Sequence, residues 1–306
     1  MPNLAKRTLG RTGLEVTTLG YGAMELRGEP RGPAVSEAEA SSILNAVLDS
    51  GINFIDTSPD YGNSEEHIGR SIAHRRSEYF LASKCGCLVG AAPAPAGQRN
   101  PHVFTAGNVR AGVEQSLRRM NTDHLDLVQF HISPNQQELE AEGALDELKK
   151  LQAEGKVRFL GMSGTLPNLR QHIAMGVFDE FQIPYSALER EHEAAIAEAA
   201  AAGAGIVIRG GVARGAPSEW DRARQGLPVK DRWEGAKLDD LLDGMSRMEF
   251  TLRFTLTLPQ LATTIVGTRN PKHLQENLDA AAKGPLPTAV YEEAKRRLAA
   301  AGSKPE

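Results

Sequence analysis

The sequence predicts a closed (β/α)8 barrel, and three observations lead to that fold class. Short apolar runs alternate with amphipathic helical segments along the 306-residue chain, and this alternation favours a parallel sheet. From residue 19 onward there are eight such strand–helix units, and their combined length suits a barrel of about 250 residues. An open, doubly wound sheet needs a glycine-rich turn after its first strand, and GYGAME at residues 20–25 lacks the third glycine.

Each element has a local signal. The run RTLGRTGLEVTTLGYG alternates around Gly10 and Gly13, which predicts a small β-hairpin leading into the first barrel strand. The eight barrel strands are short and apolar; they are expected at residues 19–22, 52–56, 79–84, 125–131, 157–162, 181–184, 205–208 and 264–266.

Helices are expected between these strands, with one extra helix at the C-terminus. They are predicted at residues 36–50, 64–74, 105–120, 138–153, 167–175, 189–202, 238–258, 271–282 and 287–301. The first has Ser36 as N-cap and acidic residues in its first turn. Residues 85–103 and 209–237 are rich in glycine and proline and are expected to be long loops. The whole chain, 1–306, is expected to be a single domain.

Composition argues against several classes of function. A net charge of -4 without a basic stripe argues against a nucleic-acid partner. No run approaches the length of a membrane span, and the N-terminus lacks the apolar segment of a secretory signal. Cys85 and Cys87, the two cysteines, are too close together for an easy disulfide and too few for a zinc site. We therefore expect a cytoplasmic protein without a metal.

Ionisable residues stand where three predicted strands end. Asp56, Lys84 and His131 each close an apolar run, and Tyr61 follows Asp56 by five residues. In a parallel barrel the carboxyl ends of the strands meet at one face, so these four side chains are expected to converge. Simpler interpretations remain open: Asp56 alone is typical of a turn or helix cap, and Asp56 with Lys84 of an ion pair between neighbouring strands.

The same residues carry a family resemblance. NFIDTSPDYG, LASKCG and DLVQFH, in this order, resemble the motifs of the aldo-keto reductase family. Farther along, EGKVRFLGMS, FDEFQIPYSALER and TTIVGTRNPKHLQENLDA resemble the family's fifth-strand, sixth-strand and eighth-strand segments. The resemblance extends over nearly the whole chain. It implies the barrel fold and the reduction of a small carbonyl substrate by hydride transfer from NADP(H) rather than NAD(H).

The resemblance also implies a role for each of the four side chains. Tyr61 is expected to be the general acid, and the Lys84 ammonium is expected to lower the pKa of its phenol. Asp56 would keep Lys84 charged and oriented. His131 would donate a hydrogen bond to the substrate oxygen, where negative charge develops as hydride arrives.

A cofactor site is implied as well. The segment IVGTRNPKH runs from the last strand into a helix N-terminus, which suits a phosphate, and Arg269 offers a planar cation for a 2′-phosphate. Gly267 stands where many family members have a lysine. The resemblance still favours NADP(H), but the contact from that lysine to the cofactor is absent. The residues expected to contact the cofactor are Gly22, Ala23, Met24, Asp56, Ser163, Gln182, Arg209, Gly210, Gly211, Val212, Arg214, Gly267, Thr268, Arg269, His273, Glu276 and Asn277.

Two other functions remain open at this point. One is an enzyme that works mainly in the oxidative direction, on an alcohol or a sugar. The other is a regulatory subunit that binds NADP(H) and senses its redox state, although such a sensor has less need of all four ionisable side chains. The sequence specifies neither the substrate nor the oligomeric state.

Overall fold

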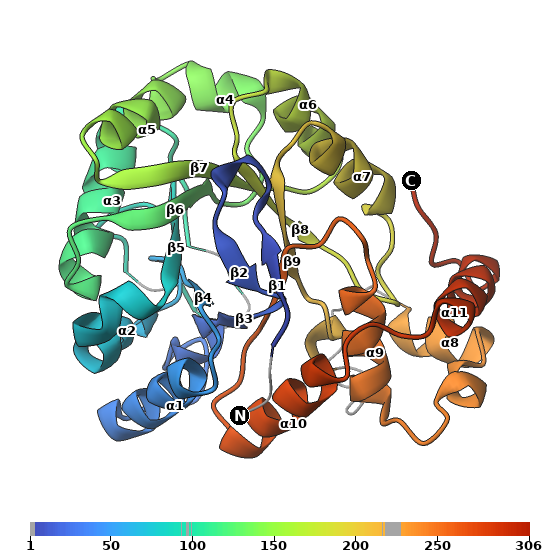
Figure 1. The fold of residues 1–306 in the computed structure, drawn as a ribbon. Coiled ribbons are helices and arrows are strands. Elements are labelled where there is room, and N and C mark those ends of the chain that lie inside the picture. The colour runs from blue at the N-terminus through green and yellow to red at the C-terminus, as the bar shows by residue number, and fades with distance from the viewer. Residues whose placement is uncertain (1–3, 93, 96–97, 99, 216, 218–227) are drawn as a thin grey trace.

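The computed structural model describes residues 4–92, 94–95, 98, 100–215, 217 and 228–306, and its centre is the predicted barrel (Figure 1). Eight parallel strands close in the order β10–β3–β4–β5–β6–β7–β8–β9. Their bounds are β3 (Leu19–Gly22), β4 (Phe54–Asp56), β5 (Phe80–Cys85), β6 (Leu125–Phe130), β7 (Val157–Ser163), β8 (Glu180–Pro184), β9 (Gly205–Arg209) and β10 (Thr263–Val266). Each expected barrel strand is therefore confirmed, with its ends shifted by no more than two residues.

Helices surround the barrel in Figure 1. Those that match a predicted range are α1 (Glu37–Asp49), α2 (Ser64–Ile72), α3 (Ala106–Met120), α6 (Asn168–Met175), α7 (Glu193–Ala201), α10 (Pro271–Ala282) and α11 (Thr288–Ala300). Ser36 caps α1 in a reciprocal capping box with Glu39, as its position predicts. Apolar residues of α1, among them Ile43 and Val47, are buried against the barrel, so the helix is stabilised mainly by this packing.

The predicted hairpin is confirmed and closes one end of the barrel. Strands β1 (Lys6–Thr8) and β2 (Glu15–Thr17) pair antiparallel, and Leu9, Leu14 and Val16 pack on residues inside the barrel. A Cβ atom on Gly10, where φ is +49°, would lie 2.2 Å from the backbone nitrogen of Gly205. Only glycine allows this approach to the start of β9, so the hairpin covers the amino ends of the strands and leaves the carboxyl ends for a site.

Three expected ranges were wrong in detail. Residues 138–153 form two helices, α4 (Gln136–Glu140) and α5 (Ala144–Ala153), because Gly143 between them has φ +72°. Residues 238–258 divide into a 3₁₀ turn, η6 (Leu238–Leu241), and α9 (Arg247–Leu256), separated by left-handed backbone at 243–244. Within the expected loop 209–237, α8 (Val229–Gly235) is helical because Trp233 packs in the core.

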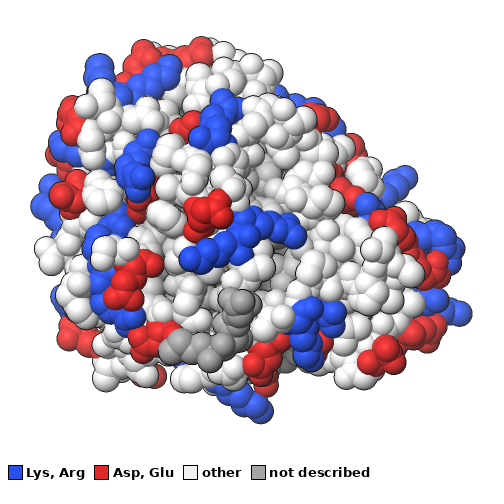
Figure 2. Space-filling model, in the orientation of Figure 1, with Lys and Arg blue, Asp and Glu red and all other residues white. Residues whose placement is uncertain are grey.

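The surface carries mixed charge. Figure 2 shows lysines and arginines interspersed with aspartates and glutamates on the face toward the viewer. Many of these form ion pairs; Arg75, for example, lies 2.7 Å from both Asp49 and Glu78. Among the residues the structure describes, no helix combines the length and apolar character needed to cross a bilayer.

Candidate active site

The four ionisable residues predicted to converge lie at the carboxyl ends of three neighbouring strands. Asp56 is the last residue of β4, Lys84 is the next to last of β5, and His131 directly follows β6. Tyr61 lies in the loop between β4 and α2. The strands β4, β5 and β6 are adjacent in the barrel, so the fold brings together residues that are up to 75 positions apart in sequence.

A buried ion pair lies at the base of this group. The Lys84 ammonium donates to both carboxylate oxygens of Asp56, at 2.9 and 2.8 Å, and to the backbone oxygen of Thr57 at 2.8 Å. Both side chains are almost fully buried. The three ammonium protons therefore have partners, which is how a charge is tolerated in a site of low dielectric.

Two amide side chains complete the environment of Asp56. Its Oδ1 atom accepts from Nε2 of Gln182 at 2.8 Å and from Nε2 of Gln129 at 3.3 Å. Ser163 in turn lies 3.4 Å from Oε1 of Gln182. The carboxylate is thus held by neighbours on three other strands, and Gln182, an expected cofactor contact, also orients Asp56.

Lys84 is held charged. Burial alone would lower its pKa, but the Asp56 carboxylate and the Tyr61 phenol raise it above its ordinary value. Its Nζ atom lies 5.3 Å from the centroid of the Tyr61 ring. The ammonium is therefore placed to stabilise negative charge that forms on the phenol oxygen.

The pKa of Tyr61 departs from the expected direction. Burial raises it, and the positive charge of Lys84 offsets only part of that effect, so the pKa stays above its usual value. The phenol is consequently protonated at neutral pH. Lys84 does not make Tyr61 a strong acid in this state of the protein; its charge counteracts the cost of leaving phenolate in a buried position.

His131 lies across from Tyr61. The two rings meet edge to face with centroids 6.2 Å apart, and the backbone N–H of His131 donates to the Cys85 carbonyl oxygen at 3.1 Å. Its Nδ1 atom is 3.1 Å from Nε2 of His102 and 3.5 Å from Sγ of Cys87. Nδ1 is thereby engaged by its neighbours, which makes Nε2 the candidate donor to a substrate oxygen.

The neighbouring histidine determines which nitrogen of His131 carries a proton. Nδ1 of His102 is 2.8 Å from the carbonyl oxygen of Asn100, so this nitrogen is the protonated donor. In a neutral pair, Nε2 of His102 then accepts from Nδ1 of His131. The Nε2 atom of His131 donates to a carbonyl only when the pair holds one additional proton.

Sequence reasoning missed His102, because it lies in the expected loop 85–103 and no spacing rule connects it to His131. The two ends of the loop are joined by a bridge between Cys87 and His102 and by the side chain of Asn108, which donates to the carbonyl oxygens of Cys87 and Val103 at 3.1 and 2.8 Å. Burial raises the pKa of the Cys87 thiol to about 12, so the thiol is neutral in this structure.

The expected cofactor contacts lie at the same end of the barrel. Ser163 ends β7, Arg209 ends β9 and Gly22 ends β3, and Gly267 follows β10. Strands β7, β8, β9, β10, β3 and β4 are consecutive neighbours in the closed barrel, so these residues lie along one continuous arc of its rim. Ala23 and Met24 follow in a 3₁₀ turn, η2 (Ala23–Leu26). Beyond β9, residues 210–212 form a turn and Arg214 lies in η4 (Ala213–Gly215), although its side chain is outside the described part.

The phosphate end of the expected site is the N-terminus of α10. Asn270 caps the helix by accepting from the backbone N–H of Lys272, and Pro271 occupies the first turn as predicted. Glu276 and Asn277 follow His273 by three and four residues, so each lies one turn along α10 from His273. His273 and Glu276 are exposed and Asn277 is half-buried.

Gly267 and Arg269 connect this helix to the first barrel strand. A Cβ atom on Gly267 would lie 2.4 Å from the Gly22 carbonyl oxygen, so the close approach of β3 explains why a lysine does not stand here. Thr268 accepts a 2.8 Å hydrogen bond from Tyr21 through its carbonyl oxygen. The Arg269 guanidinium donates to the Ala34 carbonyl oxygen at 3.0 Å, which links the connection before α10 to the segment before α1. The donors present suit an anionic dinucleotide.

Glu180 is a second residue that sequence reasoning missed. Both of its carboxyl oxygens are buried without a hydrogen-bond partner among the described residues. Burial, followed by the negative charge of Asp56, raises its pKa well above the usual range, so the carboxyl is neutral. Gly161 makes room for it, because a Cβ there would lie 2.3 Å from Oε2 of Glu180.

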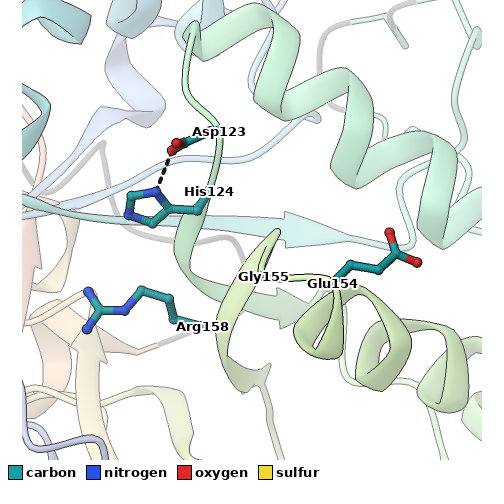
Figure 3. Close-up of a pocket in the computed structure, with 5 residues that line it drawn as sticks. All are labelled: Asp123, His124, Glu154, Gly155 and Arg158. Carbon is teal, nitrogen blue, oxygen red and sulfur yellow. Dashed lines mark hydrogen bonds and ion pairs between the residues drawn. The ribbon is translucent and has the colours of Figure 1, made fainter.

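A surface hollow of about 480 Å³ lies away from this group. Figure 3 shows its lining, in which His124 bonds Asp123 at 2.6 Å and Arg158 and Glu154 lie on either side. His124 precedes β6 and Arg158 is near the start of β7, so the hollow is at the amino ends of the strands. None of the residues predicted for the active site lines it.

Comparisons with known proteins agree with this geometry. The family model of the aldo/keto reductase family matches residues 18–298. L-galactose dehydrogenase of Arabidopsis thaliana is 27% identical, with 92% of this chain and 89% of that protein aligned. D-threo-aldose 1-dehydrogenase of a Pseudomonas species is 28% identical over 88% and 91%. The holo structure of the aldo-keto reductase AKR11C1 from Bacillus halodurans is 25% identical with a TM-score of 0.81, covering 96% of each chain. The chain belongs to the aldo/keto reductase family of oxidoreductases.

Proposed function

We propose that this protein is an NADP(H)-dependent oxidoreductase that reduces aldehyde or ketone carbonyls to alcohols, with Tyr61 as the general acid. The observation that carries the proposal is the buried Lys84–Asp56 ion pair beneath the Tyr61 ring, 5.3 Å from its centroid. A family fold alone does not specify an activity. Here the ionisable groups themselves are arranged for proton transfer at one point.

Tyr61 delivers a proton to the oxygen of the substrate. Its phenol is protonated at neutral pH because burial raises its pKa. As the proton leaves, negative charge forms on the phenol oxygen, and the Lys84 ammonium stabilises it. Asp56 keeps Lys84 in place through two hydrogen bonds, and His131 donates to the substrate oxygen.

The chain's own residues suit a bound dinucleotide. When bound, the reduced nicotinamide supplies the hydride. Ser163 and Gln182 offer polar atoms for its carboxamide, and the Arg209 plane offers a surface for stacking. The N-terminus of α10 and the Arg269 guanidinium offer donors for phosphate groups.

The rim of the site favours apolar substrates. Met24, Leu88 and Ile132 are 41%, 38% and 40% exposed, and they are the large apolar side chains most exposed among the described residues. They follow β3, β5 and β6, so they all lie at the carboxyl ends of the strands. Apolar side chains at a mouth indicate an interaction site, and here they suit an aromatic or aliphatic carbonyl compound.

Steady-state oxidation of NADPH in the presence of 4-nitrobenzaldehyde, followed by absorbance, tests the proposal. Turnover is expected, whereas a redox-sensing subunit would bind NADPH without consuming it. The names of two relatives favour a second candidate, the oxidation of a sugar. Running the same assay with aldoses and NADP⁺ or NAD⁺ separates the two, because a sugar dehydrogenase would turn over the aldoses and leave the aldehyde largely unreduced.

We also place the protein in a reducing compartment such as the cytoplasm, because Cys85 and Cys87 are both free thiols. Fractionation of the source cells tests this, and recovery of the protein from an oxidising compartment would contradict it.

Arg269→Ala is expected to weaken NADPH binding more than NADH binding. Arg269 is the cationic residue in the connection between β10 and α10, and a 2′-phosphate is the group that distinguishes the two cofactors. Loss of one charge-assisted contact costs about 1.5–3 kcal/mol, which is roughly a 10- to 150-fold rise in the Kd for NADPH. Fluorescence titration with each cofactor measures it.

Arg296→Ala serves as the matched control. This arginine lies on α11 and pairs with Glu293 on its own helix, so neither Kd should change. Equal losses of NADPH and NADH affinity in Arg269→Ala would remove the 2′-phosphate role from Arg269.

A further inference from the structure

Cys87 and His102 meet His131 at the edge of the proposed active site, and the three side chains form a compact cluster. Sγ of Cys87 lies 3.5 Å from Nε2 of His102 and 3.5 Å from Nδ1 of His131, and the two nitrogens are 3.1 Å apart. All three ligand atoms lie within 4.8 Å of one another. One thiol and two imidazoles are the donor types that zinc prefers.

The spacing of these atoms matches the edges of a tetrahedron around zinc. Zinc bonds of about 2.0–2.1 Å to nitrogen and about 2.3 Å to sulfur place two nitrogens about 3.3 Å apart and a nitrogen and sulfur about 3.6 Å apart. The observed separations are 3.1, 3.5 and 3.5 Å. An ion therefore fits among the three atoms after movements of a few tenths of an ångström.

The outer shell already holds the ligands in place. Nδ1 of His102 donates to the Asn100 carbonyl oxygen at 2.8 Å, which directs Nε2 into the cluster; metal-binding histidines commonly have this arrangement. Cys87 and His102 face each other across an antiparallel bridge. A Cβ on Gly86, where φ is +92°, would lie 2.3 Å from the Phe104 ring, so glycine is required for the turn that presents Cys87.

We propose that Cys87, His102 and His131 form a binding site for one Zn²⁺ ion, with a fourth tetrahedral position open to a small ligand such as water. The chain was expected to lack a metal because two cysteines are too few for a zinc site. In the structure, two histidines and one of these cysteines together provide three ligand atoms. On binding, the Zn–S bond replaces the S–H bond of Cys87, whose proton leaves to solvent. The Zn–N bond replaces the Nδ1–H bond of His131, whose proton passes through solvent to Nε2 of the same ring. No electron is transferred.

This site adjoins the proposed catalytic histidine. When an ion is bound through Nδ1 of His131, the single ring proton lies on Nε2, the nitrogen that would donate to a substrate oxygen. This consequence rests on the proposed function: zinc would keep His131 a hydrogen-bond donor to the substrate oxygen without the additional proton that the histidine pair otherwise needs. The binding site itself does not depend on that function.

Titration of the metal-free full-length protein with Co²⁺ tests the site directly. Cobalt takes the place of zinc, and its bond to a thiolate gives a charge-transfer band in the near ultraviolet. The band is expected to saturate at one Co²⁺ per chain and to be displaced by Zn²⁺ but not by Mg²⁺, which prefers oxygen ligands. Activity is not needed for this measurement, so its failure is separate from failure of the proposed function.

The two cysteines provide a matched pair of variants. Cys87→Ala is expected to abolish the band, whereas Cys85→Ala, which removes the buried thiol two residues away, should retain it. His102→Gln should keep the thiolate band but raise the Kd by at least about 10-fold, and it also tests the site if Cys87→Ala does not fold. A wild-type protein without a saturable band, or a band that survives in Cys87→Ala, would overturn the proposal.

Discussion

Tyr61→Phe is expected to reduce the rate of carbonyl reduction by about 10²- to 10⁴-fold, the usual contribution of a positioned general acid. Phenylalanine keeps the ring above Lys84 and its edge-to-face contact with His131, so only the transferable proton is removed. NADPH binding should remain nearly unchanged. The kcat for an aldehyde and the Kd of NADPH, measured on the same preparation, separate these two effects.

Tyr79→Phe is the matched control. Tyr79 directly precedes β5, at the amino end of the barrel, and its hydroxyl donates to the Ile72 carbonyl oxygen at 3.4 Å. The kcat of this variant should equal that of the wild type. If Tyr61→Phe retains the wild-type kcat, Tyr61 is not the general acid, whatever the cofactor affinity.

Lys84→Met is expected to destabilise the fold as well as to inactivate the enzyme. Removal of the ammonium leaves the Asp56 carboxylate buried, with the amides of Gln182 and Gln129 as its remaining side-chain partners among the described residues. Breaking a buried pair from one side costs about 3–5 kcal/mol in the free energy of unfolding, and for a chain of this size we expect the Tm to fall on the order of 10 °C. Calorimetry or thermal circular dichroism measures it.

The same substitution at an exposed pair provides the comparison. Lys283 lies 2.9 Å from Glu249 with 54% of its side chain exposed, and Lys283→Met should change the free energy of unfolding by about 0–1 kcal/mol. Equal Tm values for the two variants would show that the Lys84–Asp56 pair does not stabilise the fold. Loss of activity with an unchanged Tm would restrict Lys84 to a catalytic role.

Much of the fold followed from local pattern. The barrel strands were recognisable because each is short, apolar and bounded by a turn, and the N-cap of α1 was recognisable from Ser36 and the acidic first turn. Two of the three errors occurred where the backbone departs from its pattern at one or two residues. Gly143 and the left-handed residues at 243–244 end helices inside sequences that have helical periodicity, and that periodicity continues across the break.

Only part of the candidate site was predicted, because only some of its residues stand at recognisable positions along the chain. Asp56, Lys84 and His131 each end a strand, so knowledge of the barrel was enough to place them together. His102 and Glu180 were missed because neither has such a position. His102 comes from within a loop that reaches His131 through the bridge to Cys87, and Glu180 begins a strand and extends inward beneath Asp56.

The sequence by itself determined the eight barrel strands and the strand-end positions of Asp56, Lys84 and His131, because these depend on periodicity and on positions along single strands. Its motifs carried the family resemblance and, with it, the role expected of Tyr61. The tertiary structure decided what surrounds those side chains. Burial raises the pKa of Tyr61 although Lys84 is near, Gln182 is bound to Asp56, and Cys87, His102 and His131 meet within a few ångströms. Desolvation and the distances between ligand atoms arise only when distant segments pack together, so the chain's pattern does not contain them.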